Sequence, residues 1–307
     1  MRRRSPAVLL LSALLAVPAA CGSGGGRATT AGGSVGGRVS VVATTTQLAD
    51  FARAVGGNHV DVYGLLKPNL DPHDYEPSPA DVARLATAAV IVKNGVGLER
   101  WFDATIRNAE PKGAIVDAST GIALRRGPGT DRDPHIWHDP RNARVMVHTI
   151  ATALAGADPA HRVDYEAAEA AYAAELDRLD AEIAAEIGGL ADKKLVTNHD
   201  AFGYYVARYG LDFVGAVIPS FDSQAELSAA DVAGVVKLIR KAGVKAVFSE
   251  ASVPPKTAEA IGREAGVAVV AGPDALYGDS LGPAGSDGDT YLRMERHNTR
   301  EIVDHLR

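Results

Sequence analysis

The feature of this sequence that most constrains its fold is an alternation, from Arg38 onward, of short apolar runs with segments of helical periodicity. Parallel strands need long crossover connections, which are usually helices, so the alternation predicts parallel α/β architecture. The expected strands are Val39–Thr44, Val60–Leu66, Ala89–Asn94, Ala114–Asp117, Lys194–Asn198, Phe213–Ile218, Ala246–Ser249 and Val267–Ala271. The expected helices are Gln47–Val55, Pro79–Ala86, Leu98–Asn108, Asn142–Leu154, Ala201–Tyr209, Ala229–Ala242, Pro255–Ala265 and Asp289–Leu306. We therefore predict two similar lobes, each a four-stranded parallel sheet with flanking helices.

Between the two halves lies a segment, residues 159–189, that is rich in good helix formers and has Gly only at its end. Pro159 suits a first helical turn, and a helix of this length would run ~43 Å, as far as a whole domain. We predict one long rigid helix that joins an N-terminal lobe, 38–158, to a C-terminal lobe, 190–307. Two helices with an unmarked break are the alternative.

Charge and cysteine content exclude several classes of protein. The formal net charge is −6 and no basic run follows the first residues, which argues against nucleic-acid binding. The single cysteine excludes an intramolecular disulfide and a structural zinc site built from thiolates, so metal ligands would have to be His, Asp or Glu. Walker A and H-E-x-x-H patterns are absent from the sequence, so two common kinds of enzyme lack their simplest support.

The N-terminus has the pattern of a signal peptide. Three arginines follow Met1, an almost wholly apolar run extends from Ala7 to Val17, and small residues precede Cys21. About eleven apolar residues would rise only ~16 Å as a helix, too little for a hydrocarbon core of ~30 Å. We therefore predict that residues 1–20 are a cleaved signal peptide.

The lone cysteine follows Ala-Ala and precedes a Gly-rich run, an arrangement that resembles a bacterial lipobox, although Pro18 stands where Leu is usual. The resemblance implies cleavage before Cys21 and lipidation of its thiol. It also implies attachment at the outer face of the cell membrane or in the periplasm, with residues 21–37 as a flexible tether. An ordinary secretory signal with a chance cysteine is the alternative.

Three of the nine histidines have a distinctive context. His73 and His135 each lie in an Asp-Pro-His triplet, and His199 directly follows the predicted strand Lys194–Asn198. Proline fixes the backbone before the first two, and parallel α/β sheets bind ligands outside the carboxyl ends of their strands. Surface or packing roles are expected for His59, His148, His161, His297 and His305.

This combination predicts a transition-metal site. Imidazole nitrogen suits zinc and other first-row divalent ions, and a carboxylate would offset their charge. The acid should come from the second lobe, where Asp279 lies in a Gly-punctuated loop and Glu250 ends a predicted strand. His138, three residues after His135, could be a surface residue, an alternative ligand or a group that orients the ligands, with the surface role favoured.

In these segments the chain resembles the cluster A-I solute-binding lipoproteins, the metal-binding subunits of bacterial zinc and manganese ABC importers. The matching segments, in the family's order, are Asp71–Pro79, Asp133–Pro140, Val196–Gly210, Phe248–Lys256 and Tyr277–Gly282. The resemblance implies α/β lobes joined by one long helix, with metal held in the cleft between them. By position, it implies the ligands His73, His135, His199 and Asp279.

The resemblance also implies a non-enzymatic role. The protein would be a monomer that captures metal and delivers it to an ABC permease powered by a separate cytoplasmic ATPase. Many manganese binders of the family have Glu at the position of His199, which favours Zn²⁺ here, with Mn²⁺ or Fe²⁺ as alternatives. The histidine-free stretch Leu124–Asp133 weakens the zinc assignment, because many zinc binders carry a His-rich loop there.

Two other functions stay open at this point. A zinc hydrolase would keep a water in the fourth ligand position, with Glu250 as the base. An adhesin or scaffold would hold the metal as a structural element. The identity of the fourth ligand separates the hydrolase from a closed cargo site.

Overall fold

The computed structural model describes residues 34–35, 37–127 and 131–307. The predicted signal peptide and Cys21 lie outside the described residues, as does most of the predicted tether. Within residues 21–37, however, Ser34–Val35 forms a short strand, β1, which pairs antiparallel with the next strand. A Gly-Gly pair separates the two strands, and Gly37 has a φ of 85°, which suits a tight hairpin turn. The sheet therefore begins inside the segment that we expected to be tether.

The N-terminal sheet contains the predicted parallel strands in the order β3-β2-β4-β5, with β1 added beside the start of β2. Its strands are β2 (Arg38–Ala43), β3 (Val60–Gly64), β4 (Val90–Lys93) and β5 (Ala114–Asp117). The helices of this half are α1 (Thr46–Gly56), α2 (Pro79–Thr87), α3 (Phe102–Ala109) and α4 (Pro140–Ala157). Since all four main strands are parallel, their carboxyl ends lie at one edge of the sheet.

The C-terminal sheet is parallel throughout, in the order β7-β6-β8-β9. Its strands are β6 (Lys194–His199), β7 (Asp212–Ile218), β8 (Ala246–Phe248) and β9 (Ala268–Val270). Its helices are α6 (Gly203–Tyr209), α7 (Ala229–Ala242), α8 (Lys256–Ala265) and α9 (Tyr291–Leu306). The predicted fold, two parallel α/β lobes, is confirmed.

Local signals in the sequence explain where several helices begin. Helices α2 and α7 each start with a capping box, in which Ser78 pairs with Asp81 and Ser228 with Asp231. Helix α3 begins at Phe102, later than predicted, because the residues before it form turns in which Leu98 N–H bonds Gly95 O and Phe102 N–H bonds Glu99 O. The carboxylate of Glu99 accepts the backbone N–H groups of Asn94 and Gly95 and holds this loop in place.

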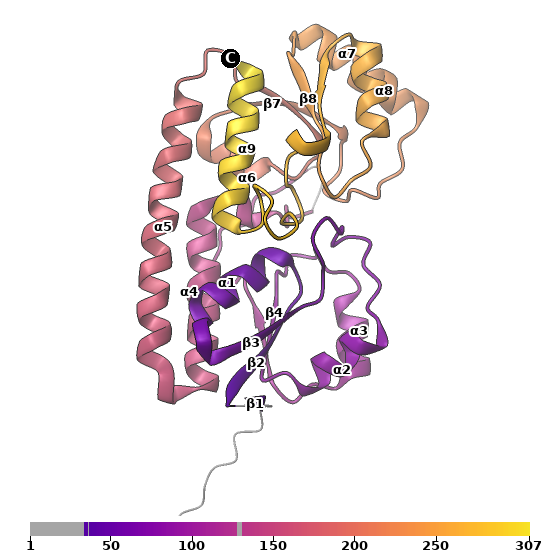
Figure 1. Ribbon diagram of the computed structural model, residues 1–307. Helices are drawn as coiled ribbons and strands as arrows, with labels where there is room; N and C mark the ends of the chain where they lie inside the picture. The colour runs from indigo at the N-terminus through magenta and orange to yellow at the C-terminus, as the bar shows by residue number, and fades with distance from the viewer. Residues whose placement is uncertain (1–33, 36, 128–130) are drawn as a thin grey trace, which may run out of the picture. The chain divides into compact units, whose positions relative to one another are not determined.

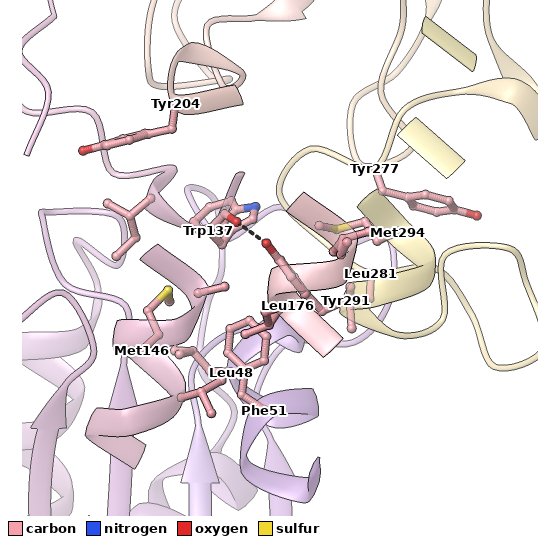
Figure 2. Close-up of a cluster of buried hydrophobic side chains, with 14 of the residues drawn as sticks. Leu48, Phe51, Trp137, Met146, Leu176, Tyr204, Tyr277, Leu281, Tyr291 and Met294 are labelled. Carbon is pink, nitrogen blue, oxygen red and sulfur yellow. Dashed lines mark hydrogen bonds between the residues drawn. The ribbon is translucent and has the colours of Figure 1, made fainter. Parts of the chain in front are cut away.

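The long helix predicted between the lobes is α5 (Arg162–Gly188), preceded by the 3₁₀ turn η3 (Pro159–His161). It runs beside α4 and α9 (Figure 1). Its buried face consists of Tyr165, Leu176, Leu179, Ile183 and Ile187. This face belongs to a hydrophobic core that continues from Leu48 of α1 to Phe248 of β8, part of which Figure 2 shows. A core shared by both lobes favours small relative movements over wide opening.

None of the helices in the described part of the chain combines the length and apolar character needed to cross a membrane.

Candidate metal centre

The structure brings together the four residues predicted as ligands. His73 follows β3, His135 directly precedes the 3₁₀ turn η2 (Ile136–His138), His199 ends β6, and Asp279 lies after β9. One ligand atom from each residue lies within 4.8 Å of the others. His135, His199 and Asp279 are completely buried, and the side chain of His73 is 4% exposed.

The ligand atoms of the four residues lie close enough together to surround one metal ion. The Nε2 atom of His135 lies 3.4 Å from Nε2 of His73 and 3.3 Å from Nε2 of His199. The oxygens of Asp279 lie 3.4 Å from Nε2 of His135 and 3.2 Å from Nε2 of His199. The distance to Nε2 of His73 is 3.7 Å. A tetrahedral ion with ligands at ~2.0–2.2 Å has ligand–ligand separations of roughly 3.3–3.6 Å. The contacts above are near this range but use both oxygens of Asp279, and one ligand atom from each residue gives separations of up to 4.8 Å, so the group surrounds room for an ion and is wider than a closed tetrahedron.

The carboxylate of Asp279 also calls for a cation. Both of its oxygens are buried, and the polar groups that face them within the described residues are the Nε2 atoms of the three imidazoles. Burial by itself raises the pKa of Asp279, but the attraction of the neighbouring imidazoles, that of His199 above all, outweighs burial and brings the pKa far below its usual range. A buried ionised carboxylate is unfavourable unless a positive charge lies beside it, and the protonated imidazole of His199 or a bound cation would supply that charge.

Two acids hold the imidazoles in a binding orientation. Asp133 Oδ1 lies 2.9 Å from His135 Nδ1 and accepts the His135 backbone N–H at 3.0 Å. Glu250 Oε1 lies 2.9 Å from His199 Nδ1 and accepts the His199 backbone N–H at 3.0 Å. With a proton on each Nδ1, the lone pair of each Nε2 faces the other ligands. Glu250 therefore lies behind His199, where it orients the imidazole, and is outside the group of four.

The Asp-Pro-His triplets explain part of this geometry. Asp71 Oδ1 accepts the backbone N–H of His73 at 2.8 Å, as Asp133 does for His135. A side chain that accepts the N–H two residues on forms an Asx turn. The repeated triplet was the signal for this role, which our sequence analysis did not assign to either aspartate.

The favoured surface role of His138 is wrong. This side chain is completely buried, its Nδ1 lies 2.9 Å from Glu295 Oε1 of α9, and its ring stacks on Phe202. Burial is possible because the carboxyl group of Glu295 supplies a hydrogen-bond partner, which comes from a helix 157 residues further along the chain. Such a pairing leaves no local pattern in the sequence. His138 lies outside the group of four.

The imidazoles differ in their proton affinity. Burial lowers the pKa of His73 to about 4, although the charge of Asp279 opposes the shift. Burial also acts to lower the pKa of His199, but the charges of Glu250 and Asp279 prevail and hold it well above its ordinary value. In the metal-free centre at neutral pH, the imidazole of His73 is therefore neutral, and that of His199 is protonated on both nitrogens and positively charged.

Comparison with known proteins places this geometry in a family. The family model described as zinc-uptake complex component A, periplasmic (ZnuA), matches residues 41–305. The chain belongs to this family. Its members are substrate-binding components of metal ABC transporters, as the sequence resemblance implied.

Named relatives differ in the metal that their names give. The chain is 30% identical to the manganese ABC transporter substrate-binding lipoprotein PsaA of Streptococcus anginosus, with 97% of each chain covered. It is 28% identical to the iron ABC transporter substrate-binding lipoprotein MtsA of Streptococcus pyogenes, over 88% of this chain and 89% of MtsA. The solved periplasmic zinc-binding protein TroA of Treponema pallidum is 29% identical, with a TM-score of 0.81 over 88% of this chain and 99% of TroA. The comparisons thus establish the family but not the metal that this chain binds.

Proposed function

We propose that this chain is the extracytoplasmic substrate-binding subunit of an ABC importer. It captures one divalent transition-metal ion, zinc in the first place, and delivers the ion to a membrane permease that a separate cytoplasmic ATPase drives. The observation that carries this proposal is the buried group of three imidazoles and one carboxylate, whose ligand atoms lie within 4.8 Å of one another, in a chain of this transport family.

Zinc is favoured by the donor set. Three imidazole nitrogens and one carboxylate suit Zn²⁺, whereas Mn²⁺ is better matched by oxygen ligands in an octahedral arrangement. Manganese and ferrous iron are the alternatives, because relatives are named for both. The second oxygen of Asp279 could raise the ligand number for either ion.

A closed cargo site is favoured over a hydrolase. A catalytic zinc needs an open fourth position for water, and the carboxylate of Asp279 lies where the fourth ligand would be. The acid that a hydrolase would use as its base, Glu250, is hydrogen-bonded to both the backbone and the ring of His199.

The N-terminal segment supports an attachment to the membrane. We propose that signal cleavage before Cys21 and lipidation of its thiol anchor a monomeric protein at the outer face of the membrane or in the periplasm. The relatives PsaA and MtsA are both named lipoproteins. Radiolabelled palmitate should enter the protein expressed in a bacterial host, and a Cys21→Ala variant should remain unlabelled.

Competitive titration of the mature chain with Zn²⁺ and Mn²⁺ tests the proposed cargo. We expect tight 1:1 zinc binding that Asp279→Ala and His135→Ala each weaken by more than ~100-fold, beyond the roughly 10–100-fold typical of groups that only orient a ligand. The matched control is His148→Ala, whose imidazole is exposed and pairs with Glu169 at the surface. Unchanged zinc binding by Asp279→Ala would reopen the hydrolase interpretation.

A further inference from the structure

Hydrogen bonds join the two lobes on two sides of the four candidate ligands. We call these sides the rim beside Asp279 and the rim beside His73. The loop that carries Asp279 is hydrogen-bonded to elements of the N-terminal half through buried or half-buried groups. The indole N–H of Trp137 donates to Gly278 O at 3.1 Å, the N–H of Leu281 to Thr46 Oγ1 at 2.8 Å, and the N–H of Asn69 to Ser280 Oγ at 2.8 Å. Tyr291 of α9 donates to the carbonyl of Trp137 at 2.6 Å, as Figure 2 shows. These hydrogen bonds hold the rim beside Asp279 closed.

The opposite rim, beside His73, has fewer and more exposed ties. Here Asp71 Oδ2 accepts the hydroxyl of Ser223 and the amide of Gln224, at 2.9 Å from the latter. Both donors follow β7 and belong to the C-terminal lobe. The other oxygen of Asp71 holds the backbone N–H of His73. A single carboxylate thus joins the turn that positions one candidate ligand to the facing lobe.

This rim is also where the centre approaches solvent. A cavity of about 290 Å³ lies here, and its lining includes His73, Arg100, Arg132, Phe221 and Asp222. Of the four candidate ligands, His73 alone contributes to this lining, and it is also the one whose side chain retains some exposure. An ion would therefore enter and leave past His73.

A second interlobe tie crosses the same mouth but should contribute little. The Arg100 guanidinium lies 2.8 Å from Asp222, and the Arg100 side chain is 71% exposed. Ion pairs as exposed as this one are screened by water and are worth ~0–1 kcal/mol. Ser223 is buried, and its bond to Asp71 involves a charged acceptor, so this bond should be the stronger tie.

We propose that Asp71 is a positioning residue that latches the mouth of the cleft, and that its bonds to Ser223 and Gln224 set the rate at which bound metal dissociates. The inference rests on the proposed function, in which the four-residue centre holds the cargo. Release then needs only a small separation at the rim beside His73, because the rim beside Asp279 stays bonded. Such a movement is compatible with the hydrophobic core that the lobes share.

The test uses the mature chain loaded with zinc and measures zinc release in a stopped-flow instrument. Excess chelator is added at concentrations where the observed rate no longer depends on chelator. We expect Ser223→Ala to release zinc roughly ten-fold faster, and Ser223→Ala with Gln224→Ala faster still. Association rates should stay within about two-fold, because neither side chain belongs to the metal-binding group. The matched control is Ser119→Ala, which removes a hydroxyl bonded to Asp117 within the N-terminal lobe.

The outcomes separate the latch from the proposed function. Tight zinc binding with unchanged dissociation rates in the Ser223 and Gln224 variants would overturn the latch and leave the cargo site intact. An equal acceleration in Ser119→Ala, or slower association instead of faster dissociation, would also overturn it. If the unaltered chain binds neither zinc nor manganese, the proposed function fails and the latch fails with it.

Discussion

Metal binding should expel a proton from the centre at neutral pH. The carboxylates of Glu250 and Asp279 outweigh burial and hold the pKa of His199 well above 6.5, so its imidazole is protonated when no metal is bound. Burial lowers the pKa of His73 to about 4, so that imidazole is already neutral. Zinc binds neutral imidazole, and the proton on His199 therefore has to leave.

The pH dependence of zinc affinity follows from the number of protons that metal binding releases. If His199 releases one proton per ion, zinc affinity changes about ten-fold per pH unit, equivalent to ~1.4 kcal/mol. The sign is fixed because protons compete with metal, so affinity rises with pH until His199 loses its proton in the metal-free protein as well. Below about pH 4 the protonation of His73 would add to the competition and steepen the dependence.

Isothermal titration calorimetry in buffers of different ionisation enthalpy measures the protons released. We expect about one proton from His199 at pH 7, and a smaller number in Glu250→Gln, because this substitution removes the largest charge that raises the pKa of His199. The matched control is Glu169→Gln, which removes the acid beside the exposed His148 and should leave the count unchanged. Binding enthalpies independent of the buffer, with zinc affinity constant between pH 5 and 7, would refute the reasoning.

Three further predictions concern residues outside the four candidate ligands. Asp133→Asn should weaken zinc binding roughly 10–100-fold in the competitive titration, because the acid that orients His135 loses its charge. Glu295→Ala should lower the free energy of unfolding by ~3–5 kcal/mol in urea denaturation of the metal-free protein, because His138 is left buried without its partner, while zinc affinity changes little. Leu176→Ala, which leaves a cavity in the core shared by the lobes, should cost ~2–5 kcal/mol in the same assay.

The parts of the fold that carry local signals could be predicted from sequence. Helix α7 spans Ala229–Ala242 as expected, because Ser228 caps its start and Gly243 adopts a positive φ of 66° after its end. Helix α3 was misplaced at its start, because the bonds of Glu99 to the loop before it are not visible in helical periodicity. The pairing of β1 was missed because two residues are too few for a periodic pattern.

The candidate site shows the same division between local and distant signals. The gathering of the four residues was predictable, because strand ends converge in a parallel sheet and the Asp-Pro-His triplet occurs twice. The pairing of His138 with Glu295 joins residues 157 positions apart, and the bond from Glu250 to His199 spans 51. Sequence spacing places these acids near strand or helix ends but does not say which imidazole each one meets.

The hydrogen bonds group the four candidate ligands differently from their order along the chain. Asp279 comes from the second half of the chain, yet Trp137, Thr46 and Asn69 bind its loop to the first half. Among the four candidate ligands, His199 lies within the C-terminal sheet itself. Its partner Glu250 lies just beyond the end of β8, after Ser249. The segment before Asp279 is also bonded to this sheet, because Leu276 exchanges backbone hydrogen bonds with Ser249 and Ala251. In the proposed cargo site, a small tilt of the sheet would therefore move His199 together with the acid that orients it and would pull on the loop of Asp279, so that binding would weaken without opening the shared core.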